Sequence, residues 1–269
     1  MIEVVNLTKS FKNVDVLKGI NVTINKGEKI VVLGPSGSGK STFLRCLNCM
    51  EDPTSGSIIF NGVDIADMSV NINVHRQKMG MVFQHFNLFN NKTVIDNIML
   101  APIYVEKKRM RKLRFSNPNG EEIKSTKQIK AEAKENAMKL LKRIGLEEKA
   151  DVFPSQLSGG QKQRTSIARA LIKNSSILIL DDSLSAVDTD TEENILNNLK
   201  ESRKDKTTII IAHRISTIMN AHHILVLDEG KTIEYGTFNE LMALNGVFKE
   251  MYDKQQLEKQ LNEGGSENG

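Results

Sequence analysis

The nine residues from Gly34 to Thr42 read GPSGSGKST, and their types and spacing suit the binding of a nucleotide phosphate. A glycine, four further residues and then Gly-Lys-Ser match the phosphate-binding loop pattern. Glycines allow backbone N–H groups to close around phosphate oxygens, and we expect Lys40 to reach the β and γ phosphates while the Ser41 hydroxyl binds Mg²⁺. The expected nucleotide contacts in this loop are Gly34, Pro35, Ser36, Gly37, Ser38, Gly39, Lys40, Ser41 and Thr42.

The alternative interpretation of this stretch is a glycine-rich turn that happens to hold a lysine, and the flanking sequence disfavours it. An apolar run at 29–33 should form the strand that leads into the loop, and residues 42–49 should form the helix that follows. The N-terminus of that helix would place a positive dipole end beside the phosphates. Strand, loop and helix therefore occur in the order that phosphate binding requires.

Two carboxylates, Asp181 and Asp182, directly follow the apolar run at 177–180. This run and the run at 207–212 are uninterrupted apolar or β-branched stretches, which is typical of central strands in a parallel sheet covered on both faces. Ligands bind at the carboxyl ends of such strands, so we expect Asp181 to hold Mg²⁺ through its water shell. The alternative role for Asp181 is to cap a helix.

A further anion site is indicated by the run LSGGQ at 157–161. Ser158 offers a hydroxyl, and Gly159 and Gly160 offer accessible backbone N–H groups at the start of a helix, where anions bind well. A plain helix cap is the alternative interpretation. Two other polar side chains end apolar runs: Gln84 ends the expected strand at 79–84, and His213 follows the run at 207–212.

In this order and spacing, GPSGSGKST, LSGGQ, ILILDD, SAVD and His213 resemble the nucleotide-binding domain of the ATP-binding cassette (ABC) transporters over nearly the whole chain. The resemblance implies an α/β fold: a P-loop NTPase core with a mixed, mainly parallel sheet, an N-terminal antiparallel β subdomain and an α-helical signature subdomain. It implies an ABC ATPase domain at 1–250, a helical subdomain at about 85–165 and a C-terminal tail at 251–269.

The resemblance also implies roles for individual residues. Ser158, Gly159, Gly160 and Gln161 would face the γ-phosphate held by a second subunit, so that two nucleotides are enclosed in a head-to-tail dimer. Asp188, in the SAVD run, belongs to the expected nucleotide contacts.

Three further residues have roles that the resemblance implies near the nucleotide. His213 would contact the γ-phosphate, and Gln84 would sense Mg²⁺ and the attacking water beside the membrane partner. Phe11 would stack on adenine, although an isolated phenylalanine is more often part of a core.

Asp182 departs from the pattern of the family, which has a glutamate there as general base. The carboxylate is present but is about 1.5 Å shorter in reach. Because a misplacement of about 1 Å can lower a rate about 10²-fold, we expect ATP binding with slow hydrolysis. A clamp that binds ATP without useful turnover is the extreme form of this expectation.

The two halves of the chain resemble different branches of the family. The stretches RCLN at 45–48, GMVFQ at 80–84 and FNLF at 86–89 are similar to ATPase subunits that import polar amino acids. The stretches DDSLSAVD at 181–188 and IAHR at 211–214 are similar to multidrug-exporter cassettes. A natural or engineered hybrid, joined between about 130 and 155, is one explanation.

Composition sets limits on partners and location. The 269 residues carry 37 basic and 33 acidic side chains, a net charge of +4 that is too mild to indicate nucleic-acid binding. Cys46 and Cys49 have helical spacing without a second ligand pair, so we expect core packing rather than metal or redox chemistry. No apolar stretch approaches the roughly 20 residues of a membrane span and no signal peptide opens the chain, which predicts a cytosolic protein whose membrane role comes through a partner. With the resemblance, this implies a peripheral location on the cytoplasmic face of the plasma membrane.

The remaining expectations concern local structure. We expect antiparallel strands at 2–5, 16–24 and 57–60, a helix from about 129 to 144, a hairpin around 228–230 and frayed residues at 261–269. The segment 107–130 is crowded with Lys and Arg and contains the loop signal NPNG at 117–120. A solvated loop insertion is the favoured interpretation of this segment, and a surface for anionic headgroups or a partner is the alternative.

Together these patterns predict an ATP- and Mg²⁺-dependent ATPase subunit that drives a separate membrane permease for polar amino acids, with a second ABC subunit as partner. An extracytoplasmic solute-binding protein is a possible further partner, and no nucleic acid is expected. The alternatives are an exporter-type nucleotide-binding domain for drugs or lipids and, more remotely, a soluble ABC ATPase that acts on ribosomes or DNA. The second phosphate loop or long coiled-coil insertion typical of those soluble proteins is not found in the sequence.

Overall fold

The computed structural model describes residues 1–182, 195–196, 199, 203–212 and 215–264, and within them the strands form two sheets. The smaller sheet is antiparallel and has the strand order β2-β1-β4-β5. Its strands are β1 (Ile2–Phe11), β2 (Val14–Ile24), β4 (Ser55–Phe60) and β5 (Val63–Asp64).

The larger sheet has the order β10-β9-β3-β8-β7-β6. Its strands are β3 (Lys29–Leu33), β6 (Met79–Val82), β7 (Ile177–Leu180), β8 (Thr207–Ile211), β9 (His223–Asp228) and β10 (Lys231–Gly236). Neighbours pair in parallel from β9 to β6, and only β10 is antiparallel to its neighbour β9. The expected α/β fold with a mixed, mainly parallel sheet and an antiparallel N-terminal part is confirmed.

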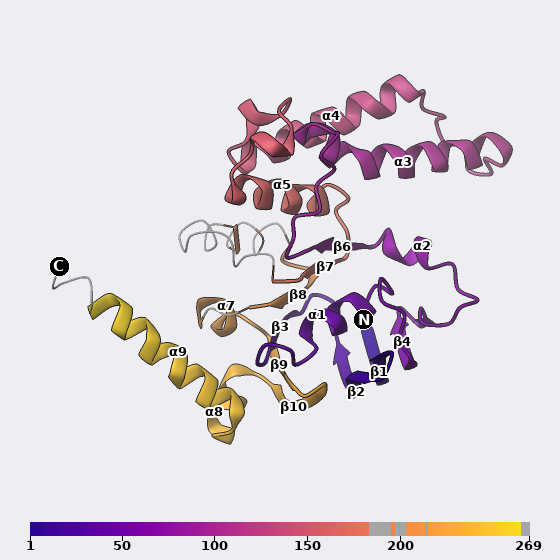
Figure 1. The fold of residues 1–269 in the computed structure, drawn as a ribbon. Helices are drawn as coiled ribbons and strands as arrows, with labels where there is room; N and C mark the ends of the chain where they lie inside the picture. The colour runs from indigo at the N-terminus through magenta and orange to yellow at the C-terminus, as the bar shows by residue number, and fades with distance from the viewer. Residues whose placement is uncertain (183–194, 197–198, 200–202, 213–214, 265–269) are drawn as a thin grey trace.

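The helices form separate groups on different sides of the two sheets (Figure 1). The long helices α3, α4 and α5 lie together beyond the β6 edge of the larger sheet, and α9 projects away from its β10 side (Figure 1). The helices are α1 (Lys40–Cys46), α2 (Ile72–Arg76), α3 (Val94–Phe115), α4 (Thr126–Arg143), α5 (Gly159–Leu171), α7 (Ile215–Met219), α8 (Phe238–Leu244) and α9 (Val247–Gly264), with 3-10 turns at Glu147–Lys149 and Pro154–Gln156.

Both faces of the larger sheet are covered, which explains its uninterrupted apolar strands. On one face, side chains of the antiparallel sheet pack around α1, whose Phe43 and Leu44 are fully buried. On the other face, α5, α7, α8 and α9 contribute apolar side chains. A third cluster joins α3, α4 and α5. The sheet therefore holds the ends of its strands rigidly.

Cys46, the last residue of α1, and Cys49, three residues further on, are buried free thiols. Burial raises the pKa of Cys46 to about 12 and that of Cys49 to about 11. Thiols with such high pKa values stay protonated and are poor metal ligands or nucleophiles. This placement agrees with the expectation of core packing.

The basic segment at 107–130 differs from the favoured interpretation of a loop insertion. Residues 107–115 are the last turns of α3, and α4 begins at Thr126, three residues before the expected start. Lys and Arg are good helix formers, and the helix ends just before Asn117 and Pro118, which disfavour its continuation. The loop signal at 117–120 is therefore located correctly, but the basic residues before it are helical.

Two other boundaries also differ from expectation. Strand β1 extends to Phe11 because its pairing with β2 continues beyond residue 5 through several irregularities. Residues 261–264, which we expected to be frayed, complete α9, and 265–269 lie outside the described residues. The buried Glu234 on β10 accepts hydrogen bonds from the backbone N–H groups of Val247 (2.6 Å) and Phe248 (3.0 Å), so its carboxylate caps α9.

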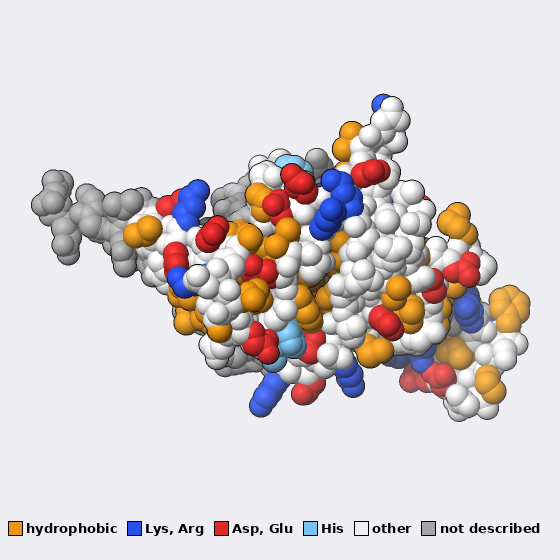
Figure 2. Space-filling model, turned by 90° about the horizontal axis from the view of Figure 1, so that it is seen from below, with side chains coloured by type: hydrophobic (Ala, Val, Ile, Leu, Met, Phe, Trp, Pro, Cys, Tyr) orange, Lys and Arg blue, Asp and Glu red, His pale blue; other side chains and the backbone are white. Residues whose placement is uncertain are grey.

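Charges of both signs are interspersed on the face of the molecule that Figure 2 shows. Among the described residues, no helix combines the length and the apolar character that a membrane span needs.

Candidate nucleotide site

The loop at 34–39 connects β3 to α1, and at Gly34 and Gly39 its contacts leave no room for a side chain. Gly34 has φ +143°, and a Cβ there would lie 2.0 Å from the carbonyl oxygen of Leu227 on β9. Gly39 has φ +97° and precedes α1, whose first hydrogen bond runs from the Phe43 N–H to the Gly39 carbonyl at 2.8 Å. The close approach to β9 and the left-handed turn therefore both require glycine.

Lys40 begins α1, is largely buried and points back into the loop. Its ammonium donates to the carbonyl oxygens of Gly34 (2.8 Å) and Pro35 (2.7 Å). Burial lowers the pKa of Lys40, and the negative charge of Asp182 partly offsets this effect. Lys40 thus places a positively charged hydrogen-bond donor at the centre of the loop. Phosphate oxygens could replace the two carbonyl oxygens as its acceptors.

Asp181 follows β7 and is fully buried. One of its carboxylate oxygens lies 3.3 Å from Arg45 Nε, and its backbone N–H donates to the Val82 carbonyl at 2.9 Å. The other carboxylate oxygen has no hydrogen-bond partner among the described residues. A buried oxygen without a partner is costly, so this oxygen fits a metal-water shell.

Asp182 and Gln84 face each other across the site. Gln84 Nε2 donates to Asp182 Oδ2 at 3.4 Å, although the two residues follow different strands. Asp182 adopts φ 45°, a left-handed conformation that non-glycine residues adopt infrequently.

The loop, Gln84 and Asp182 enclose one cavity of about 420 Å³. Its lining residues are Val16, Ser36, Gly37, Gly39, Lys40, Ser41, Thr42, Gln84, Asp182 and Ile211. The sequence reasoning missed Val16 and Ile211, because nothing in a β-branched strand residue separates a cavity wall from a core position. The arrangement brings together a cation, a hydroxyl, an amide and a carboxylate, which are the groups needed to hold a phosphate and orient a water.

Phe11 and the LSGGQ run do not line this cavity. Phe11 ends β1 and is 41% exposed, with Lys9 Nζ 4.7 Å from the centre of its ring. An exposed ring is available for stacking, which a core phenylalanine would not be.

Ser158 is the N-cap of α5 and forms a capping box with Gln161. The Gln161 N–H donates to Ser158 Oγ at 3.3 Å, and the Ser158 N–H donates to Gln161 Oε1 at 2.9 Å. Ser158 and Gly159 are exposed, and a Cβ at Gly159 would meet nothing within 4 Å. Within one chain the run is a capped helix start with open space before it. Asp188 and His213 lie outside the described residues.

Comparisons with known proteins agree with this geometry. A family described as ABC transporter matches residues 17–185. The arginine transport ATP-binding protein ArtM of Bacillus subtilis (strain 168) is 41% identical over 242 residues, covering 89% of this chain and 92% of that protein. The glutamine transport ATP-binding protein GlnQ of the same organism is 40% identical over 245 residues, covering 90% and 93%.

A solved structure is similar over nearly the same extent. It is a dimeric ATP-binding cassette in a post-hydrolysis state bound to ADP and Pi, 31% identical with a TM-score of 0.76. The match covers 88% of this chain and 98% of that one.

The packing of the loop against β9 predicts a contrast between two glycines. Replacing Gly34 with Ala should lower the free energy of unfolding by about 3 kcal/mol, because the added methyl overlaps the Leu227 carbonyl. Gly37 also has a positive φ (+82°), but a Cβ there meets nothing within 4 Å. Gly37→Ala should therefore cost only the backbone strain, about 1 kcal/mol. Urea unfolding followed by circular dichroism measures both, and equal losses would contradict this packing.

Proposed function

Because the chain belongs to the ABC transporter family, as an ATP-binding subunit with ATPase activity, we propose that it energises the import of polar amino acids through a separate membrane permease. The observation that supports this proposal most strongly is the single cavity shared by Lys40, Ser41, Gln84 and Asp182. The arginine and glutamine transport proteins that match both halves of the chain support the solute class.

In the proposed reaction, the chain positions ATP and its attacking water. The backbone N–H groups of the loop and the Lys40 ammonium bind the phosphates, and Phe11 stacks on adenine. Asp182 accepts a proton from the water that Gln84 orients, since these two side chains already face each other. Mg²⁺, which Ser41, Asp181 and Gln84 would hold, supplies neutralisation of the phosphate charge when bound. Positioning and charge neutralisation are the main sources of rate in phosphoryl transfer.

We infer that the complete site needs two chains. The capped start of α5 is exposed and does not line the cavity, so it can present Ser158 and the N–H groups of Gly159 and Gly160 to a nucleotide on another chain. A helix N-terminus of this kind is suited to a γ-phosphate. In the same scheme, His213 and Asp188 complete the contacts. The partner is a second copy or a related ABC subunit.

We propose that the chain binds its permease from the cytoplasmic face of the plasma membrane, and that an extracytoplasmic solute-binding protein delivers the amino acid. An exporter-type role is the second candidate, because Asp182 and the run at 181–188 resemble exporter cassettes. The two candidates differ in the membrane protein and in the direction of transport.

Because the carboxylate of Asp182 is shorter than that of glutamate, we expect a longer side chain at this position to increase ATP hydrolysis. Asp182→Glu should raise the steady-state ATPase rate, by up to about 10²-fold, because the longer carboxylate reaches the attacking water. Asp182→Asn should abolish hydrolysis while ATP binding remains. Phosphate release measures the rates, and fluorescent-ATP titration measures binding.

A matched control for this change is Asp151→Glu, an exposed position outside the cavity, which should leave the rate unchanged. An Asp182→Glu rate equal to that of the unmodified chain would show that the reach of this carboxylate does not limit hydrolysis.

The shared-site scheme predicts that charge at the start of α5 blocks dimerisation and leaves nucleotide binding intact. Gly159→Glu fits the free chain, since the space there is open, but its carboxylate would repel the γ-phosphate of a second chain. In the Asp182→Asn background, light scattering with ATP should show dimers, and the added Gly159→Glu should leave monomers. Gly159→Ala is the control and should still dimerise. Dimers of the Gly159→Glu chain would contradict the scheme.

The transport role is tested by purification in mild detergent and reconstitution. The chain should copurify with an integral-membrane permease, and vesicles containing the complex should take up labelled arginine or glutamine when ATP is present. ATP-driven movement of drugs or lipids in the opposite direction would favour the exporter candidate. Ribosomes or DNA without any membrane protein would exclude both.

A further inference from the structure

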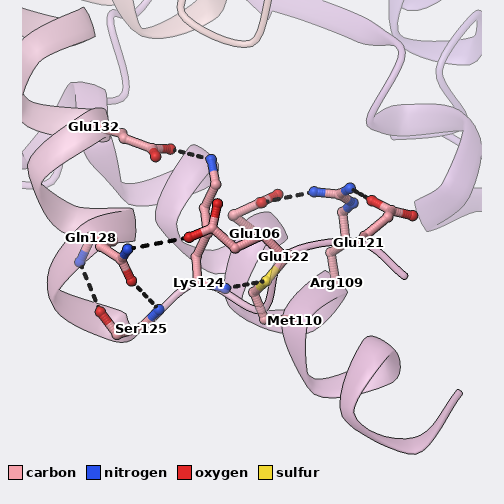
Figure 3. Close-up of polar contacts among 9 residues, drawn as sticks. All are labelled: Glu106, Arg109, Met110, Glu121, Glu122, Lys124, Ser125, Gln128 and Glu132. Atoms are coloured by element: carbon pink, nitrogen blue, oxygen red, sulfur yellow. Dashed lines mark hydrogen bonds and ion pairs between the residues drawn. The ribbon is translucent and has the colours of Figure 1, made fainter. Parts of the chain in front are cut away.

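The outer end of the α3–α4 pair has a defined surface rather than a loose loop. We refer to residues 104–128 as the hairpin tip. The Asn117 side chain closes its loop, donating to the Glu121 carbonyl and accepting from the Glu121 N–H, both at 2.8 Å. The Lys124 N–H donates to the buried Met110 sulfur at 3.2 Å, and Ser125 forms a capping box with Gln128 at the start of α4 (Figure 3).

The carboxylates at the hairpin tip are engaged in contacts between α3, the loop and α4 (Figure 3). Arg109 pairs with Glu106 at 2.9 Å and also with Glu121. Lys124 Nζ lies 2.7 Å from Glu132 Oε2. The remaining acidic side chain of the loop, Glu122, accepts a hydrogen bond from Gln128 at 3.5 Å. These contacts pair the carboxylates of the hairpin tip with Arg109, Lys124 and Gln128.

The basic side chains of α3 are distributed differently. Six of the eight residues at 107–114 are Lys or Arg, and among them only Arg109 forms an ion pair with a carboxylate of the described residues. The other five are Lys107, Lys108, Arg111, Lys112 and Arg114. The hairpin tip is therefore segregated by charge, with an unpaired basic face on the outside of α3.

Two aromatic rings lie on this same basic face. Tyr104, Lys108, Arg111 and Phe115 have the spacing i, i+4, i+7 and i+11, which places them along one side of a helix. Tyr104 is 67% exposed and Phe115 is 92% exposed. A phenylalanine so exposed at the end of a helix has no packing role within the chain. Its ring can contact an apolar surface outside the chain.

We propose that the basic face of the hairpin tip docks on the surface of an anionic lipid bilayer. Lys and Arg attract acidic headgroups, and their long stems let the charge remain at the interface while the rings of Tyr104 and Phe115 enter the headgroup region. The bilayer is favoured over a nucleic acid because the family places this chain beside a membrane and the net charge is only +4. The contact does not depend on which solute is transported.

This surface gives the chain a second membrane attachment besides its permease. One weak interaction holds a protein on a membrane only marginally, whereas two act together. Lipid charge would then increase the occupancy of the permease by its ATPase subunit.

Vesicle co-sedimentation of the purified full chain tests the proposal. Binding should be strong to vesicles of 30% phosphatidylglycerol in phosphatidylcholine, absent with phosphatidylcholine alone, and weakened by high salt. Each basic side chain near such a surface contributes about fivefold to the partition constant. The double variant Lys108→Glu/Arg111→Glu should therefore bind at least about 25-fold more weakly.

The matched control reverses the same amount of charge elsewhere. Lys26→Glu/Lys254→Glu changes two exposed lysines outside the hairpin tip and should retain most of the binding. Lys108→Gln/Arg111→Gln provides a milder change with less risk to folding, which circular dichroism and ATP binding verify. Equal losses in the tip and control variants would indicate nonspecific attraction and overturn the proposal.

A fluorescence measurement tests whether the side chain at position 115 enters the bilayer. The chain contains no tryptophan, so Phe115→Trp introduces a single reporter. Its emission should shift to the blue with anionic vesicles, whereas a reporter at the exposed Phe153 should not respond. No shift at position 115, or binding of a single-stranded RNA 20-mer in preference to the vesicles, would contradict bilayer docking.

Discussion

The site depends on one constraint: the buried ammonium of Lys40 and the buried carboxylate of Asp181 must each have a polar partner within the fold. The carbonyl oxygens of its own loop accept the hydrogen bonds of Lys40, and Arg45 pairs with one oxygen of Asp181. Both arrangements require rigid neighbours. The covered parallel sheet supplies them, since β3 leads into the loop and β7 ends at Asp181. A nucleotide and its cation can then replace interactions that the chain otherwise makes with itself.

The sequence predicted the parts of this site whose chemistry is local. The glycines and Lys40 have defined spacing, and Asp181 directly follows a fully apolar strand, so their positions in the fold follow from pattern alone. The hydrogen bond between Gln84 and Asp182 depends on the pairing of β6 with β7, which joins residues about a hundred positions apart. Val16 on β2 and Ile211 on β8 reach the cavity through the arrangement of other strands. Such neighbours follow from topology rather than from residue type.

At the hairpin tip, the interpretation of the basic run as a loop, made from charge alone, was wrong. A run of Lys and Arg indicates solvent exposure, but it is equally compatible with a helix, and α3 continues through it to Phe115. The ion pairs that engage Arg109, Lys124 and the acidic residues connect positions 3 to 12 residues apart, in ways that no periodicity reveals. Helical geometry then converts a basic run into one face with aligned aromatic rings.

In the proposed dimer each chain supplies half of a catalytic site, with the cavity on one chain and the start of α5 on the other. The most direct test is the ATPase rate per chain measured over a wide range of chain concentrations at saturating ATP. A shared site predicts that the rate per chain rises with concentration and then reaches a plateau as dimers form. A rate per chain that stays constant down to concentrations at which light scattering shows only monomers would contradict the account.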